Sequence, residues 1–227
     1  MKKDLWEDLE RSLEKIIPYY NVMNKVMSLG NEEFLREKMM DYVPENIDVY
    51  GDIGTGPGNI SLKIVSERNV DEPFLIDPSM EMLKNNKSGG EKVCAIMEEL
   101  PFKDETFDLV TCGFSFRDSY SHEDAAKEIS RVIKNNGKLI ILDIGKPDSK
   151  LLFFIYSIYI FFIPLLSSMI ITKFKHIHEY FTLFYTYVFY PPHGEILKMF
   201  EKNGMMYEHG IKKMGGALFL DIFKKQG

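Results

Sequence analysis

The chain has 227 residues, of which 45% are hydrophobic and 27% are charged, and its formal net charge at pH 7 is −6. This length suits one α/β domain with a complete core and is short for two independent domains. The acidic balance argues against a nucleic-acid-binding protein, which would carry a basic surface, and it provides no general attraction to anionic lipid.

The N-terminal segment predicts two helices. Residues 4–17 repeat apolar side chains at helical spacing, and Pro18 ends the pattern. A second helix is expected over 32–42, because the pair Val43-Pro44 disfavours helix beyond it. The first residues are charged and lack the apolar stretch of a signal peptide, so we expect a cytoplasmic protein.

Apolar strands alternate with helical patterns in the next hundred residues. In chain order we expect strand 47–53, helix 60–68, strand 73–77, helix 79–86 with Ser79 as its N-cap, strand 92–97, strand 107–114, helix 122–133 stopped near Asn135-Asn136-Gly137, and strand 138–144. Strands that are apolar on both faces and separated by helices indicate a parallel sheet covered on both sides.

The C-terminal part predicts a helix over 193–204 and two strands, 205–213 and 216–225. Their short connection at Gly215-Gly216 favours an antiparallel pair. The expected fold class is therefore α/β and Rossmann-like, with a mostly parallel sheet, an antiparallel C-terminal strand and helices on both faces. We expect Cys94 and Cys112 to be reduced thiols buried in strands, and no metal-ligand spacing is present.

The segment 151–190 is unusually aromatic, and its first part, 151–172, carries no charge over 22 residues. That length could span a membrane, but Pro164 interrupts it, and the strands before and after it must join one sheet. Two interpretations remain open. The segment is a buried helix pair over the core, or it is a lid whose outward apolar face admits an isoprenoid tail or makes peripheral contact with a membrane.

Three glycines, Gly54, Gly56 and Gly58, follow the first strand and open a helix. Glycine is required where the main chain turns sharply or touches a ligand. A phosphate-binding loop would end in Gly-Lys-Ser/Thr, and a dinucleotide turn would place glycine at position 59, which is Asn59. The alternating spacing after Asp52 fits S-adenosylmethionine better, and a tight turn without a ligand is the alternative.

Asp77 ends the next strand, 19 residues after Gly58. An acid at this place can accept hydrogen bonds from two ribose hydroxyls, although it could instead cap the following helix. Ile96 and Met97 could provide an apolar slot for adenine, with any hydrogen bond to adenine coming from the main chain. The expected cofactor-binding set is Asp52, Gly54, Gly56, Gly58, Asp77, Pro78, Met82, Ile96, Met97 and Gly113.

Several stretches resemble the menaquinone/ubiquinone-biosynthesis C-methyltransferases, a class I methyltransferase family. They are YYNVMNKVMSLG (19–30), the glycine turn, LIDPSMEML (75–83), LPFKDETFDLVTCGFSFRD (100–118), EISRVIKNNGKLIILDIGKP (128–147) and KMGGALFLD (213–221). The resemblance implies S-adenosylmethionine as methyl donor, S-adenosylhomocysteine as product, and a lipophilic, polyprenyl quinol as acceptor. The chain departs from the family at Asp118, where Asn is usual, and at 187–190, where Ser-Ile-Arg is usual.

Roles for site residues follow from this resemblance and from the chemistry of ring methylation. Arg117 could stabilise a phenolate, and His178 or His193 could act as general base. The alternatives are a surface or helix-capping role for the arginine and a surface position for either histidine. The expected acceptor contacts are Tyr20, Asn24, Phe114, Arg117, Asp118 and Tyr185. Methylation of a soluble small molecule at O or N, and donor binding without catalysis, remain as alternatives.

We expect one methyltransferase domain over 1–227. Its parts are an N-terminal helical cap (1–45), a donor-binding core (46–147), an apolar aromatic lid (148–192), and a closing helix with two strands (193–227).

Overall fold

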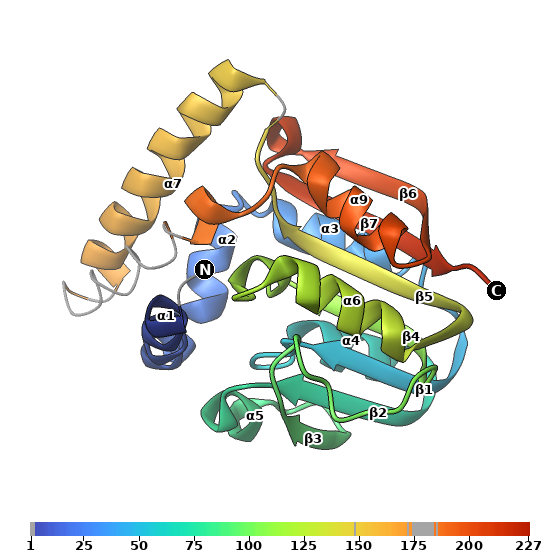
Figure 1. Ribbon diagram of the computed structural model, residues 1–227. Helices are drawn as coiled ribbons and strands as arrows, with labels where there is room; N and C mark the ends of the chain where they lie inside the picture. The colour runs from blue at the N-terminus through green and yellow to red at the C-terminus, as the bar shows by residue number, and fades with distance from the viewer. Residues whose placement is uncertain (1–2, 148, 172, 174–183, 185) are drawn as a thin grey trace.

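A computed structural model describes residues 3–147, 149–171, 173, 184 and 186–227, and one seven-stranded sheet forms its centre (Figure 1). The strands are β1 (Asn46–Ile53), β2 (Asn69–Asp77), β3 (Glu91–Cys94), β4 (Phe107–Gly113), β5 (Ile133–Ile144), β6 (Met205–Lys213) and β7 (Leu218–Lys225). Their order is β3-β2-β1-β4-β5-β7-β6. β1 to β5 pair in parallel, and β7 is antiparallel to both β5 and β6. The predicted mixed sheet is confirmed.

Helices cover both faces of this sheet. The helices are α1 (Lys3–Ile16), α2 (Tyr20–Met27), α3 (Asn31–Met39), α4 (Asn59–Glu67), α5 (Met80–Asn85), α6 (His122–Val132), α7 (Lys150–Ile171) and α9 (His193–Lys202), with short 3-10 turns η1 (Ile17–Tyr19), η2 (Phe116–Asp118) and η3 (Met214–Gly216), and α7 lies away from the sheet (Figure 1). Figure 1 shows α6 and α9 on one face and α3 and α4 on the other. Ile129 and Phe200 belong to the core on the first face, and Leu35 and Ile64 to the core on the second.

Several local expectations differ from the structure. The helix α2 was not expected, and the predicted helix 32–42 is α3, which ends at Met39. α6 ends at Val132, one residue before its expected end at 133, because Ile133 is already extended and begins β5. β3 is shorter than 92–97, and its last residue, Cys94, is exposed instead of buried. β3 lies at the edge of the sheet and pairs with β2 on one side, so its residues have fewer neighbours than those of the central strands.

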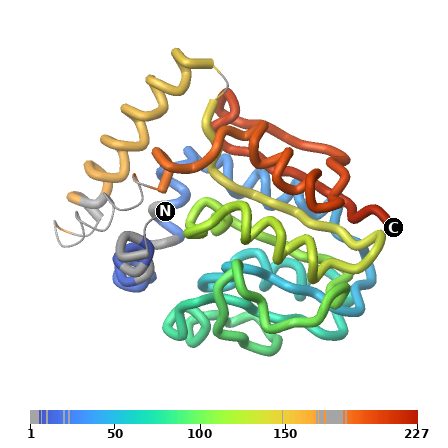
Figure 2. Tube along the Cα trace, viewed as in Figure 1, coloured from blue at the N-terminus to red at the C-terminus, as the bar shows by residue number. Residues whose placement is uncertain are grey.

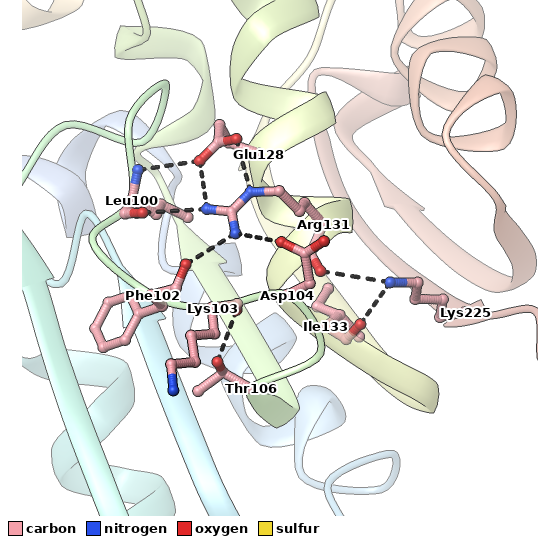
Figure 3. A network of polar contacts seen from close by, with 9 residues as sticks. All are labelled: Leu100, Phe102, Lys103, Asp104, Thr106, Glu128, Arg131, Ile133 and Lys225. Atoms are coloured by element: carbon pink, nitrogen blue, oxygen red, sulfur yellow. Dashed lines mark hydrogen bonds and ion pairs between the residues drawn. The ribbon is translucent and has the colours of Figure 1, made fainter.

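Arg131 on α6 fixes the loop that joins β3 to β4 (Figure 3). Its guanidinium donates to the carbonyl oxygens of Leu100 and Phe102 at 3.1 and 2.8 Å, and it pairs with Glu128 and Asp104 at 2.8 Å each. The loop has no strand partner of its own, so these bonds satisfy its carbonyl groups. The motif LPFKDETFD therefore forms a rigid loop beside the sheet.

α7 is mostly exposed over residues 150–167, so this part of the apolar segment is not buried over the core. Only 11% of the window Lys150–Ser167 is buried, and its mean hydropathy of 1.9 makes it long and apolar enough to cross a membrane by composition. Figure 2 shows the helix leaving the end of β5 and running apart from the sheet. Tyr159 holds it to α2, because its hydroxyl donates to the Val26 and Met27 carbonyl oxygens at 3.2 and 3.1 Å.

The neighbouring strands argue against a membrane crossing by α7. β5 ends before the helix and β7 follows it, yet the two strands pair along Lys138–Ile144. A single crossing would place them on opposite sides of a bilayer. The division of the chain into cap, core, lid and closing segment stays a prediction.

Candidate active site

The turn after β1 contains three glycines in left-handed conformations. Gly54, Gly56 and Gly58 have φ values of 67°, 52° and 89°. A Cβ on Gly54 would lie 2.3 Å from the Cβ of Ser115, and one on Gly58 would lie 2.3 Å from Oδ1 of Asn86, so packing alone requires glycine at both positions. A Cβ on Gly56 would meet nothing within 4 Å. The main chain at Gly56 therefore faces open space.

Asp77 connects the end of β2 to this turn. Its Oδ2 accepts a hydrogen bond from the backbone N–H of Gly56 at 2.8 Å, and its Oδ1 accepts one from Ser79 at 2.9 Å. The side chain of Ser79 caps α5, as expected, by accepting from the N–H of Met82 at 3.1 Å. Burial raises the pKa of Asp77 to about 6. Each carboxylate oxygen keeps capacity to accept one more hydrogen bond.

A cavity of about 730 Å³ opens beside Gly56 and Asp77. Of the predicted cofactor and acceptor residues, it is lined by Gly54, Gly56, Asp77, Pro78, Met82, Ile96, Met97, Phe114 and Asp118. Sequence reasoning missed the part of the wall that α1 provides, which consists of Trp6, Leu9 and Leu13. The hydroxyl of Ser79 donates to Oε1 of Glu14 at 2.6 Å and holds α1 over the cavity.

Asp52 and Gly113 lie beside a second, smaller cavity of about 280 Å³, together with Arg36 of α3. The carboxylate of Asp52 accepts hydrogen bonds from the hydroxyls of Thr55 and Thr111 at 2.7 Å each. Burial raises its pKa, and these hydrogen bonds oppose the rise. The two cavities share Gly54 and Phe114, so they are adjacent. Arg36 was not expected at the site, because only tertiary packing brings α3 to the glycine turn.

Arg117 is buried behind the first cavity, and it is not among the described residues that line it. Its Nη1 donates to Oδ1 of Asp143 at 3.0 Å, and its backbone N–H donates to Oδ2 of Asp143, also at 3.0 Å. Its Nε lies 3.4 Å from Oδ1 of Asp118, which does line the cavity. Burial raises the pKa of Asp118 to about 6, although the Arg117 charge opposes the rise.

Two of the expected acceptor residues, Asn24 and Phe114, line a third cavity of about 360 Å³ between α2, α7 and β7. Phe114 has a φ of 58° and borders all three cavities. His178 and Tyr185 lie outside the described residues, as does the side chain of Tyr20. Among the described residues, no group of three or more His, Cys, Asp or Glu side chains could hold a metal ion.

Comparison with family models matches residues 3–223 to the ubiE/COQ5 methyltransferase family. The chain belongs to the ubiE/COQ5 methyltransferase family. The ubiquinone/menaquinone biosynthesis C-methyltransferase UbiE of Rickettsia massiliae is 30% identical over 213 residues, which cover 88% of this chain and 84% of the relative. The UbiE protein of Rickettsia prowazekii is 28% identical over 217 residues, covering 90% and 87%.

Solved structures share the fold of this ubiE/COQ5 family member. A SAM-dependent methyltransferase from Thermotoga maritima superposes with a TM-score of 0.68 and 18% identity over 96% of this chain and all of its own (100%). One from Aquifex aeolicus gives a TM-score of 0.53 and 18% identity over 84% and 89%. The protein is therefore a class I, S-adenosylmethionine-dependent methyltransferase.

The residues of the first cavity fit S-adenosylmethionine as methyl donor. The main chain at Gly56 has space where a Cβ would stand, so a ligand can touch it. Asp77 has two carboxylate oxygens that can accept hydrogen bonds from hydroxyl groups, and Ile96 and Met97 form an apolar wall that suits an aromatic base. The smaller cavity beyond Gly54 contains a cation, Arg36, of the kind that pairs with the methionine carboxylate.

Proposed function

We propose that the donor lies across the first two cavities, with its adenosine beside Asp77, Ile96 and Met97 and its methionine end beside Arg36. The shared border at Gly54 and Phe114 supports this placement, because the two cavities are adjacent there. In this placement Gly54 and Gly58 shape the turn, and Gly56 and Asp77 touch the donor. Asp52 stabilises the turn by accepting a hydrogen bond from Thr55, and it lines the cavity that would hold the methionine end of the donor.

The proposed reaction is the C-methylation of a lipophilic quinol that carries an isoprenoid tail. Two observations support it: curated relatives are named as ubiquinone/menaquinone biosynthesis C-methyltransferases, and α7 exposes an apolar face beside the site. The observation that carries the proposal is the third cavity, which α7 helps to form and which shares Phe114 with the donor cavity. A soluble polar acceptor needs no such apolar wall.

The donor supplies a methyl group that its sulfonium charge has already activated. The protein must align the acceptor with this methyl group and exclude water, and alignment alone can contribute about 7–11 kcal/mol. Arg117 does not line the donor cavity, so we assign it a positioning role, in which it holds Asp118 at the wall. The proposed roles of His178 and Tyr185 rest on the sequence alone.

The decisive experiment measures transfer of a labelled methyl group. The purified protein is incubated with labelled S-adenosylmethionine and a panel that contains demethylnaphthoquinols with one or more prenyl units, benzoquinol analogues, a soluble catechol and a soluble amine. We expect label only in the prenylated quinols, bound to a ring carbon in a product that mass spectrometry identifies.

The controls separate donor binding from acceptor choice. Asp77→Ala should abolish transfer because it removes the ribose contact, whereas Asp48→Ala, at an exposed acid, should leave transfer intact. Label in the catechol or the amine, with none in the quinols, would overturn the quinol proposal and favour O- or N-methylation of a soluble molecule.

A further inference from the structure

The third cavity is lined by polar side chains whose hydrogen-bonding capacity is not fully satisfied within the protein. Within the described residues, the side-chain nitrogen Nδ2 of Asn24 on α2 and the hydroxyl of Tyr156 on α7 are buried there without a hydrogen-bond partner. A buried donor left unpaired costs about 1–3 kcal/mol. Two such donors at one cavity indicate that a ligand with oxygen acceptors completes them.

A carboxyl group lines the same cavity. Glu32 of α3 is buried, and its Oε2 lies 3.4 Å from Nη2 of Arg36. Burial raises the pKa of Glu32, the neighbouring Glu33 adds to the rise, and Arg36 and Lys25 oppose it. Tyr156 keeps its proton, because burial raises its pKa above the usual value. The cavity therefore combines a hydroxyl donor, an amide donor and a carboxylate that can accept a proton.

The rest of the cavity wall is apolar. It includes Met27 from α2, Ile160 from α7, Ile144 from the end of β5 and Leu218 from β7. A flat ring with two oxygens fits such a lining, whereas a charged or sugar-like acceptor would leave polar groups unpaired against these walls. Phe114 is the described residue that this cavity shares with both donor cavities, so the ring would lie next to the methyl donor.

We propose that the cavity between α2, α7 and β7 is the acceptor site, in which Asn24 and Tyr156 donate hydrogen bonds to the ring oxygens of a hydroquinone and Glu32 accepts the hydroxyl proton. This inference rests on the proposed quinol methylation. It also gives α7 two functions: one face, through Tyr156 and Ile160, closes the site, and the opposite face is apolar and exposed.

The proton and electron balance of the step is as follows. The Glu32 carboxylate takes the proton of the ring hydroxyl, and the ring carbon beside that oxygen forms a bond to the methyl carbon. The carbon–sulfur bond breaks, and its electron pair stays on sulfur. The ring carbon then loses its own proton to water, and Glu32 returns the first proton to the ring oxygen. Each turnover therefore releases one proton.

The test separates acceptor binding from donor binding. The probe is a demethylnaphthoquinol with one prenyl unit, kept reduced under anaerobic conditions, and its Kd is measured by calorimetry in the presence of S-adenosylhomocysteine. Tyr156→Phe and Asn24→Ala should each weaken quinol binding about tenfold, the effect of losing one hydrogen bond to the ligand. The Kd of S-adenosylhomocysteine should not change, which also shows that each variant is folded.

Glu32 is tested by the rate rather than by affinity. Glu32→Gln should lower kcat about 10²- to 10⁴-fold with little change in quinol KM, and it should remove the acidic limb of the pH profile of kcat. Asp118→Asn should keep that limb, because Asp118 lines the donor cavity instead. The matched control for the tyrosine is Tyr42→Phe, whose ring stacks on His209 and does not line the cavity.

The possible outcomes distinguish the two proposals. If the wild type methylates quinols but Tyr156→Phe and Asn24→Ala bind the probe as tightly as the wild type does, the acceptor site lies elsewhere. The same holds if Glu32→Gln keeps both rate and pH profile. If the wild type binds S-adenosylhomocysteine but transfers no methyl group to any quinol, the proposed function fails, and this assignment fails with it.

Discussion

The three glycines of the turn after β1 are required for different physical reasons. Gly54 and Gly58 leave no room for a Cβ, because Ser115 and Asn86 occupy that space. Gly56 has the room, so only its positive φ and the approach of a ligand require glycine there. Substitution at Gly56 should therefore separate ligand binding from folding, and substitution at the other two should not.

Gly56→Ala should weaken binding of S-adenosylhomocysteine at least tenfold while lowering the free energy of unfolding by only about 1 kcal/mol, the usual cost of a positive φ at a non-glycine residue. Calorimetry and urea denaturation measure the two effects. The matched control is Gly204→Ala, with a φ of 81° and no atom within 4 Å of its Cβ. It carries the same backbone cost away from the site. Equal donor binding in the Gly56 and Gly204 variants would contradict the placement of the donor.

Asp77 predicts a pH dependence of donor binding. Its folded pKa of about 6 lies above its ordinary value of 3.8, so the carboxylate becomes protonated as the pH falls through 6. Ribose hydroxyls donate to the ionised form, and donor affinity should therefore fall below about pH 6 and be constant above pH 7. Between about pH 4 and 6 the same shift makes folding less favourable as the pH rises, because burial disfavours the charge.

Calorimetric titration of S-adenosylhomocysteine from pH 5 to 8 checks this dependence. Asp77→Asn should flatten the pH profile and weaken binding throughout. Asp118 has a similar pKa and lines the same cavity, so Asp118→Asn is the necessary control, and its profile should keep the inflection. If the inflection survives in Asp77→Asn and disappears in Asp118→Asn, the titrating group is Asp118, and the proposed contact between Asp77 and the ribose is wrong.

Predictability from sequence differs among the site residues. The spacing of the glycines and the acid at the end of β2 were readable, because the chain connects them through one strand–turn–helix–strand unit. Sequence patterns did not indicate Arg36, Glu32 or Tyr156, because these residues reach the site only through the tertiary packing of α3 and α7. The interpretation of Arg117 as a phenolate-stabilising group considered its position after β4 but not Asp143, which engages it.

At the scale of elements, α4, α5, α6 and α9 were predicted to within two residues, whereas β2 and β5 begin four and five residues before their expected starts. Strand β6 matches its expected bounds, 205–213, because apolar runs bounded by glycines and turns mark strands clearly. The helix α2 was missed because it has only eight residues and begins two residues after Pro18, where the first helical pattern ends. For α7 the composition indicated a helix but not its exposure, because exposure depends on tertiary packing.

The exposed face of α7 predicts peripheral membrane contact. Leu151, Phe154, Ile155, Ile158 and Phe162 are 67, 62, 51, 45 and 49% exposed. We expect the protein to sediment with phosphatidylcholine vesicles, and Phe154→Ser with Phe162→Ser to reduce the bound fraction severalfold, because each buried aromatic side chain contributes about 1.5–3 kcal/mol. Phe34→Ser, at an exposed aromatic of α3, is the control. A wild-type protein that stays in the supernatant at low salt would rule out this role of α7.

At the scale of the whole molecule, the net charge of −6 predicts that the membrane contact is hydrophobic rather than electrostatic. An acidic protein gains nothing from anionic lipid, so vesicle binding should not increase with phosphatidylserine content and should not weaken in high salt. The same negative net charge argues against a nucleic-acid partner.

The single sheet predicts one ligand-dependent unfolding transition. S-adenosylhomocysteine at about 100 times its Kd should add about 2.7 kcal/mol to the free energy of unfolding. For a chain of this size the midpoint should rise by roughly 5–10 °C. Differential scanning calorimetry measures the shift, and Asp77→Ala should lose most of it. Two transitions, of which only one responds to the ligand, would show that the donor-binding strands and the closing strands unfold separately.

The strand order has a consequence for biosynthesis. β7 is the last strand to be translated, yet it lies between β5 and β6 and pairs with both. While the ribosome is still making residues 145–217, the outer edge of β5 therefore has no partner, and a bare apolar edge invites intermolecular pairing. A nascent polypeptide stalled before Leu218 should depend on chaperones and be cut readily by protease, and release past Lys225 should end that sensitivity.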